Sequence, residues 1–539
     1  MKRLLLYIAV LLGLSLPTVS LAQTAPLTTE EGRADRARPA TPSPAPAPTA
    51  QGQVLATAPA FTPFVLKGLQ VDGSSLPQAV LHQAAQPYVG REITEADLVK
   101  IADAVGKLYA ASDIALYTVL APRQSGEGGL ARLVAIEGFI SDIKVTSGER
   151  GPPPSLTRAY GDRLLAEKPL TKSGLQRYVG LMRDIPGASI DVQLLQGARP
   201  GAVRLAVTTE IKRFQTTLSV NNRGAAFLGR TQIEASVSAN SLFREGQQTR
   251  LTLAAPTEWE RFQYVAISHS EPLGASGATL TVSGGHISTK PKIAGYEIDG
   301  SATTGAILLG YPVIRGNTRN LYASASLDGV DSDNALFGRR ISREQTRVAR
   351  VAATLVEQSP KMSASAGATL SQGVDGLGAQ ASPLGGKSDF SKINAQANYT
   401  QVAGTFVVRL SANAQYSSSR VPGPEQYALG GAQFGRAFAS AVISGDSGYA
   451  GSVELAWRPA KTPKPIVGSE LYGFADHGEV WSKARPAGSR SMALASAGVG
   501  ARLAWAGRGM IELEVARPID SPPGVSQGTQ LMINLRSLL

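Results

Sequence analysis

The polar residues between positions 435 and 480 offer two kinds of chemistry. Ser447 lies in the run Gly445-Asp446-Ser447-Gly448, and Asp476 and His477 follow further along the chain. A serine, a histidine and an aspartate are the residue types of a hydrolase with a serine nucleophile. Arg436 and Asp476 could instead form an ion pair, because a guanidinium presents a planar set of donors that a carboxylate can accept.

The order of the residues argues against a hydrolase. Trypsin-like proteases carry the same four-residue run around their nucleophile, but their histidine and aspartate precede the serine, whereas here both follow it. The chain has no cysteine, and its 4 histidines lack the spacing of metal ligands: His82, His269, His286 and His477. The glycine-rich run of residues 376–381 is not followed by a helical pattern, as a dinucleotide-binding fingerprint would be. We therefore expect no catalytic residue, no cofactor and no bound metal.

The N-terminus predicts export from the cytoplasm. Met1-Lys2-Arg3 places positive charge before an apolar run from Leu4 to Leu16, and Ser20-Leu21-Ala22 supplies the small residues of a cleavage site. Residues 1–22 are therefore interpreted as a secretory signal peptide. Since no later stretch of about 18 apolar residues could form a membrane helix, the mature chain is either a soluble exported protein or a β-barrel. Export without any cysteine fits the envelope of a Gram-negative bacterium.

The composition gives weaker constraints. The net charge of +12 is compatible with nucleic acid as a partner. However, lysine and arginine are scattered without a run of five, and the predicted signal peptide directs the chain out of the cytoplasm. Basic residues that line a lumen or face the periplasm explain the charge better. A hydrophobic fraction of 43% with 57 glycines suits either a soluble all-β protein or a porin-like barrel.

Two compact modules are predicted after a linker. Residues 23–62 are rich in proline and alanine and favour an extended, unpacked backbone; residues 28–36 within them could form a short helix that plugs a barrel, or stay disordered. Residues 63–147 are expected to form an α+β module with a strand at 64–71, helices at 76–86 and from Thr94, and strands at 114–122 and 130–136. Thr94 and Asp97 form a capping arrangement, and the helix they begin has one apolar face. Residues 148–212 repeat this plan, with helices at 156–167 and 172–183.

Residues 213–539 have the pattern of a barrel. Short segments with one apolar face alternate with Gly, Asn, Asp, Ser and Pro, as in Leu251, Leu253 and Ala255, which are separated by Thr252 and Ala254. Lipid-facing strands need this period of two, although a soluble sandwich would give it too. The length of the region corresponds to on the order of 16 strands of roughly 10 residues, which is too many for one sandwich. We predict α+β periplasmic modules followed by an all-β transmembrane barrel of about 16 antiparallel strands.

Several motifs resemble those of outer-membrane protein transporters. Gly90-Arg91-Glu92-Ile93-Thr94 and Glu137-Gly138 resemble the pattern of a POTRA domain of the hemolysin-activator type, although the glycine usual after the second helix is missing between Tyr109 and Ile114. Residues 269–274, 308–315 and 474–480 resemble strand motifs of two-partner secretion transporters and occur in the family's order. Gly435-Arg436-Ala437-Phe438, followed by Gly445-Asp446-Ser447-Gly448, resembles the inward-folded loop of a superfamily that also includes barrel-assembly insertases. The family has glycine where this chain has Ala437, and it more often ends in an aromatic residue than in Leu539.

The resemblance implies a role for each motif residue. Arg436 and Asp476 would lock the loop against the inner wall, and Phe438 would pack the loop tip onto it. The remaining positions would belong to the loop motif (Gly435, Ala437, Gly445, Asp446 and Gly448) and to the wall motif (Phe474 and Gly478).

The resemblance also implies a function. The chain would be an outer-membrane translocator that exports a large hemolysin- or adhesin-like exoprotein from the periplasm without nucleotide hydrolysis. Its partners would be this cargo, outer-membrane lipid and the barrel-assembly machinery that inserts it, and it would act as a monomer. Two alternatives remain: an outer-membrane assembly factor of the same superfamily, and a passive porin, which would leave the two modules and the Arg436 loop unexplained. The cargo-binding residues of the POTRA domains stay unknown.

Overall fold

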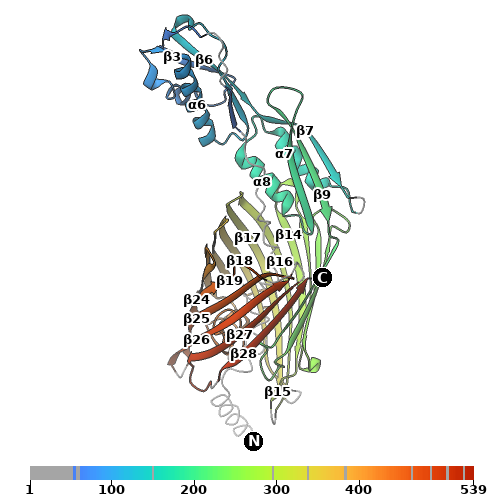
Figure 1. Cartoon of the computed structure of the whole chain (residues 1–539). Helices are drawn as coiled ribbons and strands as arrows, with labels where there is room; N and C mark the ends of the chain where they lie inside the picture. The colour runs from blue at the N-terminus through green and yellow to red at the C-terminus, as the bar shows by residue number, and fades with distance from the viewer. Residues whose placement is uncertain are drawn as a thin grey trace.

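Two α+β modules are joined to one end of a β-barrel (Figure 1). The computed structural model describes residues 52–55, 61–148, 151–293, 296–336, 339–381, 385–462, 465–485, 488–505, 509–525 and 528–538. The predicted signal peptide and the possible plug helix lie outside these residues. None of the helices within them is long and apolar enough to cross a membrane.

The first module is a four-stranded mixed sheet packed against helices. The strand order is β1 (Gly52–Leu55), β5 (Tyr117–Leu120), β6 (Leu130–Glu137) and β3 (Gly68–Asp72). The predicted first strand is split, because β2 (Phe64–Val65) pairs with β4 (Glu92–Ile93) instead. The helical elements are α5 (Gln78–His82), η1 (Gln86–Tyr88), α6 (Glu95–Ala111) and η2 (Glu127–Gly129).

Helix α6 is fixed at both ends. Thr94 and Asp97 form the predicted capping box, in which each side chain accepts the backbone N–H of the other. Past the last turn, the Lys172 ammonium donates to the carbonyls of Ala110 (2.6 Å) and Ser112 (2.7 Å). Because this lysine satisfies carbonyls that a glycine-containing turn often satisfies, the helix can end without the family's glycine.

The apolar face of α6 forms the centre of the first module's core. Its residues Leu98, Ile101 and Tyr109 are fully buried against the sheet. Burial raises the pKa of Tyr109, so its hydroxyl stays protonated and donates to Glu137 (2.8 Å). The same carboxylate accepts the Ser75 backbone N–H (2.7 Å). Glu137 therefore ties the end of β6 to α6 and to the loop before α5.

The second module begins earlier than expected. Its sheet has the order β7 (Phe139–Ser147), β9 (Ala202–Ile211) and β8 (Ala188–Gln196), covered by α7 (Ser155–Ala166) and α8 (Lys172–Arg183). We expected the first module to extend to residue 147, but β7 pairs in parallel with β9. The boundary between the modules lies at Gly138. Its N–H donates to the Leu116 carbonyl of the first module, and its carbonyl accepts the Leu170 N–H of the second (both 2.8 Å).

The barrel confirms the predicted fold class. In the described part of the chain, sixteen strands form a closed antiparallel sheet, in which β10 pairs with both β11 and β28; a short β15 (Lys292–Ile293) pairs with β16 only. The strands are β10 (Phe214–Asn221), β11 (Gln232–Asn240), β12 (Gln248–Pro256), β13 (Phe262–Pro272), β14 (Thr279–Thr289), β16 (Tyr296–Arg315), β17 (Arg319–Leu336), β18 (Arg339–Ser359), β19 (Met362–Gly373), β20 (Ser391–Ala403), β21 (Phe406–Ser417), β24 (Ser447–Trp457), β25 (Ile466–Arg485), β26 (Gly488–Trp505), β27 (Gly509–Asp520) and β28 (Gln530–Leu538).

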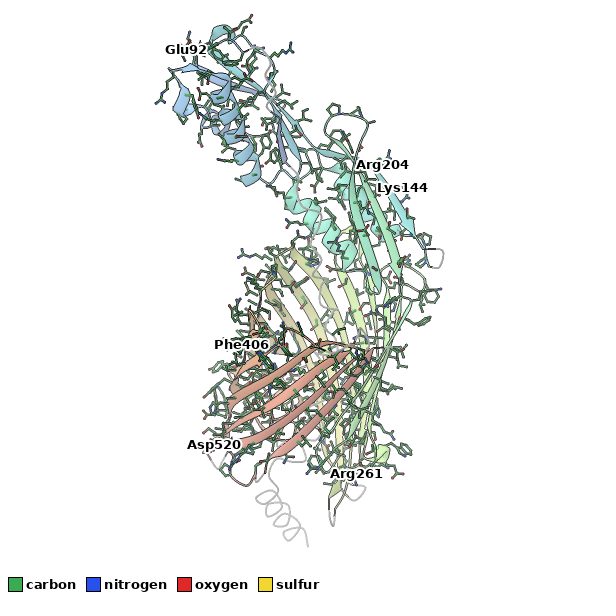
Figure 2. All side chains as sticks on the ribbon, viewed as in Figure 1. Glu92, Lys144, Arg204, Arg261, Phe406 and Asp520 are labelled. Carbon is green, nitrogen blue, oxygen red and sulfur yellow. The ribbon has the colours of Figure 1, made fainter. Side chains whose placement is uncertain are left out.

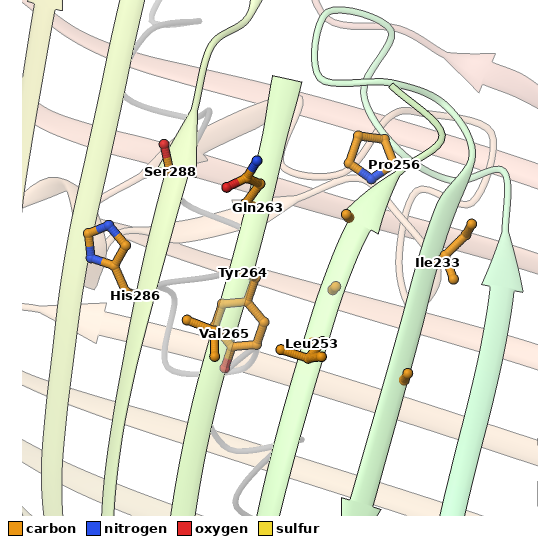
Figure 3. A pocket seen from close by; sticks show the side chains of 11 residues that line it. Ile233, Leu253, Pro256, Gln263, Tyr264, Val265, His286 and Ser288 are labelled. Atoms are coloured by element: carbon orange, nitrogen blue, oxygen red, sulfur yellow. The ribbon is translucent and has the colours of Figure 1, made fainter. Parts of the chain in front are cut away.

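The two ends of the barrel follow from the strand directions. β10 leaves the second module, so the barrel end at Phe214 is the module end, and the strands then alternate in direction. Figure 2 labels Arg261 and Asp520 at the opposite, outer end. The outward face carries exposed apolar residues such as Leu253 and Val265, and Figure 3 shows a hollow of this face between β11 and β14. This is the surface that meets lipid.

Turns at the module end of the barrel hold the second module. The Glu245 carboxylate, from the turn between β11 and β12, accepts the backbone N–H groups of Leu156 (2.7 Å) and Thr157 (2.9 Å) at the start of α7. A carboxylate is favourable there because these N–H groups have no partner within the helix. At the end of β16, Arg315 binds Asp184 through two nitrogens at 2.7 and 2.9 Å. The second module is therefore fixed to the barrel at two separate points.

Candidate functional site: the inward-folded loop

The segment between β21 and β24 folds back into the barrel. Its two arms pair as β22 (Tyr427–Leu429) and β23 (Ile443–Gly445), preceded by η5 (Gly423–Glu425). The tip packs onto the inner wall through buried apolar side chains: Phe434, Ala437 and Phe438 from the loop with Tyr472, Phe474 and Leu494 from the wall. Phe438 is only 1% exposed. The loop is therefore a packed part of the barrel interior.

Asp476 of β25 holds the backbone of the loop tip. Its carboxylate accepts the N–H groups of Gly435 (2.8 Å) and Arg436 (3.3 Å), and also the Ser496 hydroxyl (2.7 Å). The prediction of an ion pair between the Arg436 and Asp476 side chains is therefore wrong. The carboxylate is committed to two backbone donors and a hydroxyl, and the guanidinium points to other acids.

The Arg436 guanidinium binds two glutamates that the sequence did not indicate. Its Nη1 lies 3.0 Å from Glu454 of β24 and 3.3 Å from Glu514 of β27. The guanidinium carbon also lies 4.2 Å from the centre of the Phe474 ring, a distance at which a cation is attracted to an aromatic face. The loop tip is thus attached to three wall strands, β24, β25 and β27.

These contacts belong to a larger group of charges, which we name the module-end cluster. Glu454 links Arg436 to Arg409 (2.8 Å) and Arg502 (2.9 Å), and Glu514 links it to Arg223, which follows the end of β10 (2.8 Å). The full set is Arg223, Arg409, Arg436, Arg458, Arg502, Glu454, Glu470, Glu512 and Glu514. Glu454 and Arg502 lie near the module ends of β24 and β26, so most of the cluster lies toward the module end of the barrel.

A second group of charges holds the first arm of the loop, which leads from β21 through η5 and β22 to the tip and which we call the descending arm. We name this group the outer-end cluster (Glu425, Arg350, Lys392 and Asp328). Glu425 is 1% exposed and accepts both Nη2 bonds of Arg350 of β18 (2.8 and 2.9 Å). Its carboxylate also lies 3.0 Å from the Lys392 ammonium of β20, and Asp328 of β17 accepts from Arg350 (2.6 Å). The descending arm is thus anchored to β18 and β20, on the other side of β21 from the strands that hold the loop tip.

Asp446 fixes the return of the chain from the loop into β24. Its two carboxylate oxygens accept the N–H groups of Val421 (2.9 Å) and Lys483 (2.8 Å). The neighbouring Ser447 hydroxyl accepts the N–H of Ser417 (3.1 Å). His477 lies next to Asp476 on a strand, so their side chains point to opposite faces of the barrel wall. Ser447, Asp476 and His477 therefore do not form a catalytic group.

Small residues let the loop approach the wall. A Cβ atom at Gly478 would lie 2.7 Å from Leu429 Cδ1, and one at Gly448 would lie 2.3 Å from Tyr427 Cδ1. At Gly445 it would lie 2.8 Å from the Trp481 carbonyl oxygen. Glycine at these points of the wall and of the loop therefore permits the close approach.

Gly435, next to Arg436 at the loop tip, is sensitive to substitution. Its φ is +71°, and an added Cβ would lie 2.7 Å from Leu494 Cδ1. We expect Gly435→Ala to displace the tip, because the left-handed conformation alone costs a non-glycine residue roughly 1–2 kcal/mol. The barrel should then unfold at a lower temperature, measured by its shift in gel mobility after heating. Ala437→Gly, which restores the family's glycine, is the matched control and should leave this temperature nearly unchanged; equal effects of the two variants would contradict the assignment.

The glutamates that bind the loop could have been suspected from strand alternation. Glu454 lies between Val453 and Leu455, both of which are more than half exposed on the outward face. Because side chains alternate between the faces of a strand, a charge between two lipid-facing residues must point into the lumen. The same pattern holds for Glu514 between Leu513 and Val515.

Comparisons with known proteins agree with this geometry. Residues 202–503 match the family model described as haemolysin secretion/activation protein ShlB/FhaC/HecB, and residues 64–138 match the POTRA domain, ShlB-type. The heme/hemopexin transporter protein HuxB of Haemophilus influenzae is 22% identical over 478 residues, which cover 85% of this chain and 84% of that protein.

Solved structures share the fold. CdiB from Escherichia coli has a TM-score of 0.74 at 18% identity, with 89% of this chain and 91% of that chain covered. CdiB from Acinetobacter baumannii has a TM-score of 0.70 at 15% identity, with 97% and 100% covered. Both likenesses extend over the modules and the barrel together.

Proposed function

The chain belongs to the haemolysin secretion/activation protein family (ShlB/FhaC/HecB), and on this basis we propose how its inward-folded loop and its two modules serve export. It is an outer-membrane two-partner secretion transporter, with POTRA structure on the periplasmic side, that exports a partner exoprotein. The open questions are how the lumen is controlled and how the cargo is received.

We propose that the loop narrows the lumen of the resting transporter and yields when cargo passes. The supporting observation is that ion pairs hold the loop at two levels along the barrel axis. Arg436 belongs to the module-end cluster, and Glu425 belongs to the outer-end cluster. The loop tip packs onto β24–β27, while Gln396 and Asn398 of β20 stay exposed. These residues face the lumen, because they share a face of the strand with Lys392. Cargo would therefore pass along the β20 wall, and the contact between Glu425 and Lys392 would open as it passes.

The remaining parts have roles that follow from this scheme. Residues 1–22 would direct export, residues 139–211 would form a second POTRA domain, and the barrel-assembly machinery would insert the chain as a monomer. Unfolded cargo would bind a sheet edge of the POTRA domains by strand addition. Its folding outside the cell would draw it through, so that the transporter needs neither nucleotide hydrolysis nor a catalytic residue.

The experiment that tests the function compares strains with and without this chain. We expect the culture medium of the deletion strain to lose one large exoprotein while the outer-membrane profile stays the same, and the wild-type gene to restore it. Depletion of several barrel proteins from the membrane, with an unchanged medium, would instead support an assembly factor.

A further inference from the structure

A piece of the linker occupies the edge of the first module's sheet. β1 (Gly52–Leu55) pairs in parallel with β5, in the register Gly52 with Tyr117 through Leu55 with Leu120. β5 is in turn antiparallel to β6. Without β1, the backbone groups of Tyr117–Leu120 on that side would form an open sheet edge, which is a template for any extended chain.

The β5 edge is held rigidly by the rest of the module. The Tyr117 ring stacks on Tyr109 of α6, with ring centres 4.9 Å apart and planes at 23°. Its hydroxyl donates to the Gly106 carbonyl (3.1 Å), and Val119 is fully buried. A strand that adds here therefore meets a preformed surface.

The segment that pairs with the β5 edge has features that would let another strand replace it. β1 is only four residues long, and it pairs with no strand other than β5 among the described residues. The sequence before it includes five prolines between residues 39 and 48, and proline disfavours pairing in a sheet because it lacks a backbone donor. Among the described strands, the linker therefore gives up only its pairing with β5 when it leaves the edge.

The position of this edge connects it with the second module. Directly before β5, the Ala115 N–H donates to the Leu170 carbonyl (2.8 Å), and Ile114 forms a β-bridge with Thr171. A strand that pairs with the β5 edge therefore lies close to the contact between the two modules. The second module is fixed in turn to the barrel through Glu245 and Arg315.

We propose that Gly52–Leu55 is a built-in placeholder for cargo, and that an extended segment of the exported exoprotein displaces it by pairing in parallel with β5. The inference rests on the proposed export function and names the edge at which strand addition occurs. Occupation by the linker protects the edge until cargo arrives.

The main test locks the placeholder in place. Because the chain has no cysteine, Gln53→Cys combined with Thr118→Cys, which are partners in register, can form only one intramolecular disulfide. Thr118 neighbours the buried Val119 and so lies on the opposite face of the strand, away from the core. We expect the oxidised double variant to export at least about tenfold less exoprotein into the medium, and a reductant to restore export. Each single variant should export like wild type.

A binding measurement tests the same edge without the natural cargo. In the purified full chain, residues 52–55 are replaced by Gly-Ser-Gly-Ser, which keeps the length but pairs poorly in a sheet. A fluorescent peptide that copies residues 50–57 should bind this variant at least about tenfold more tightly than wild type. Equal binding to both proteins would overturn the proposal.

The outcomes separate this inference from the function on which it rests. If the locked variant exports normally while deletion of the whole gene abolishes export, the β5 edge is not the cargo site, and the edges at β7 and β8 become the next candidates. If deletion of the gene removes no exoprotein, the export function itself is refuted.

Discussion

Replacing Arg436 with alanine is expected to reduce export of the exoprotein by at least about tenfold, with the barrel still inserted in the membrane. The substitution removes the cation that Glu454 and Glu514 share and the contact with Phe474. Breaking a buried ion pair by removing one partner costs about 3–5 kcal/mol, whereas roughly 1.4 kcal/mol already changes an equilibrium tenfold. The loop tip would then keep its backbone bonds to Asp476 and its apolar packing, but it would lose its ion pairs with β24 and β27. The measurement is the amount of exoprotein in the medium per inserted transporter.

Arg458→Ala is the matched control. Arg458 belongs to the same module-end cluster through Glu470, but its side chain is 43% exposed and it does not lie in the loop. Loss of an exposed ion pair is worth about 0–1 kcal/mol, so this variant should export nearly like wild type. Normal export by the Arg436→Ala variant, or an equal loss in both variants, would remove the loop contact from the mechanism.

Replacing Glu425 with glutamine is expected to free the descending arm of the loop and to lower the temperature at which the barrel unfolds. The change removes the carboxylate that faces Arg350 and Lys392, and all three side chains are buried. Repulsion between the two cations is then balanced only by Asp328, so the loss should approach the upper part of the range of about 3–5 kcal/mol for a broken buried pair. We expect protease to cut the loop in the purified variant and not in wild type.

A double variant separates the effect of an unbalanced buried charge from the effect of losing the contact that positions the descending arm. Glu425→Gln with Lys392→Met removes one charge of each sign, and replacing both partners of a buried pair is often nearly neutral. The unfolding temperature should therefore recover, while the loop should stay more accessible to protease than in wild type. If the double variant unfolds at the same temperature as the single variant, the outer-end cluster does not act through its charges.

The parts of the fold that were predictable from the sequence depend on local patterns. The capping box of Thr94 and Asp97, the bounds of α8 and the alternation in the barrel are set by residues within a few positions of one another. The end of the first module could not be placed in this way, because β7 follows β6 directly and only its pairing with β9 assigns it to the second sheet.

The partners of the loop were harder to predict than the loop itself. The motif residues around Arg436 gave its location, but an arginine on a loop tip can reach several strands, and its acids come from β24 and β27. Asp476 was correctly placed at the loop but binds its backbone. Glu425 belongs to no motif that we considered; its role depends on Arg350 and Lys392, which come near it only when the barrel closes.

The central claim is that cargo crosses the lumen along the wall that the loop leaves exposed. The most direct measurement places a photo-crosslinking amino acid at Asn398, on the lumen face of β20, or at its neighbour Tyr399, on the lipid face, and irradiates cells during export. Both side chains are exposed, so the two positions differ mainly in the face that they occupy. We predict crosslinks to one large exoprotein from position 398 and none to it from position 399. Crosslinks to the exoprotein from neither position, or from both equally, would contradict passage through the lumen.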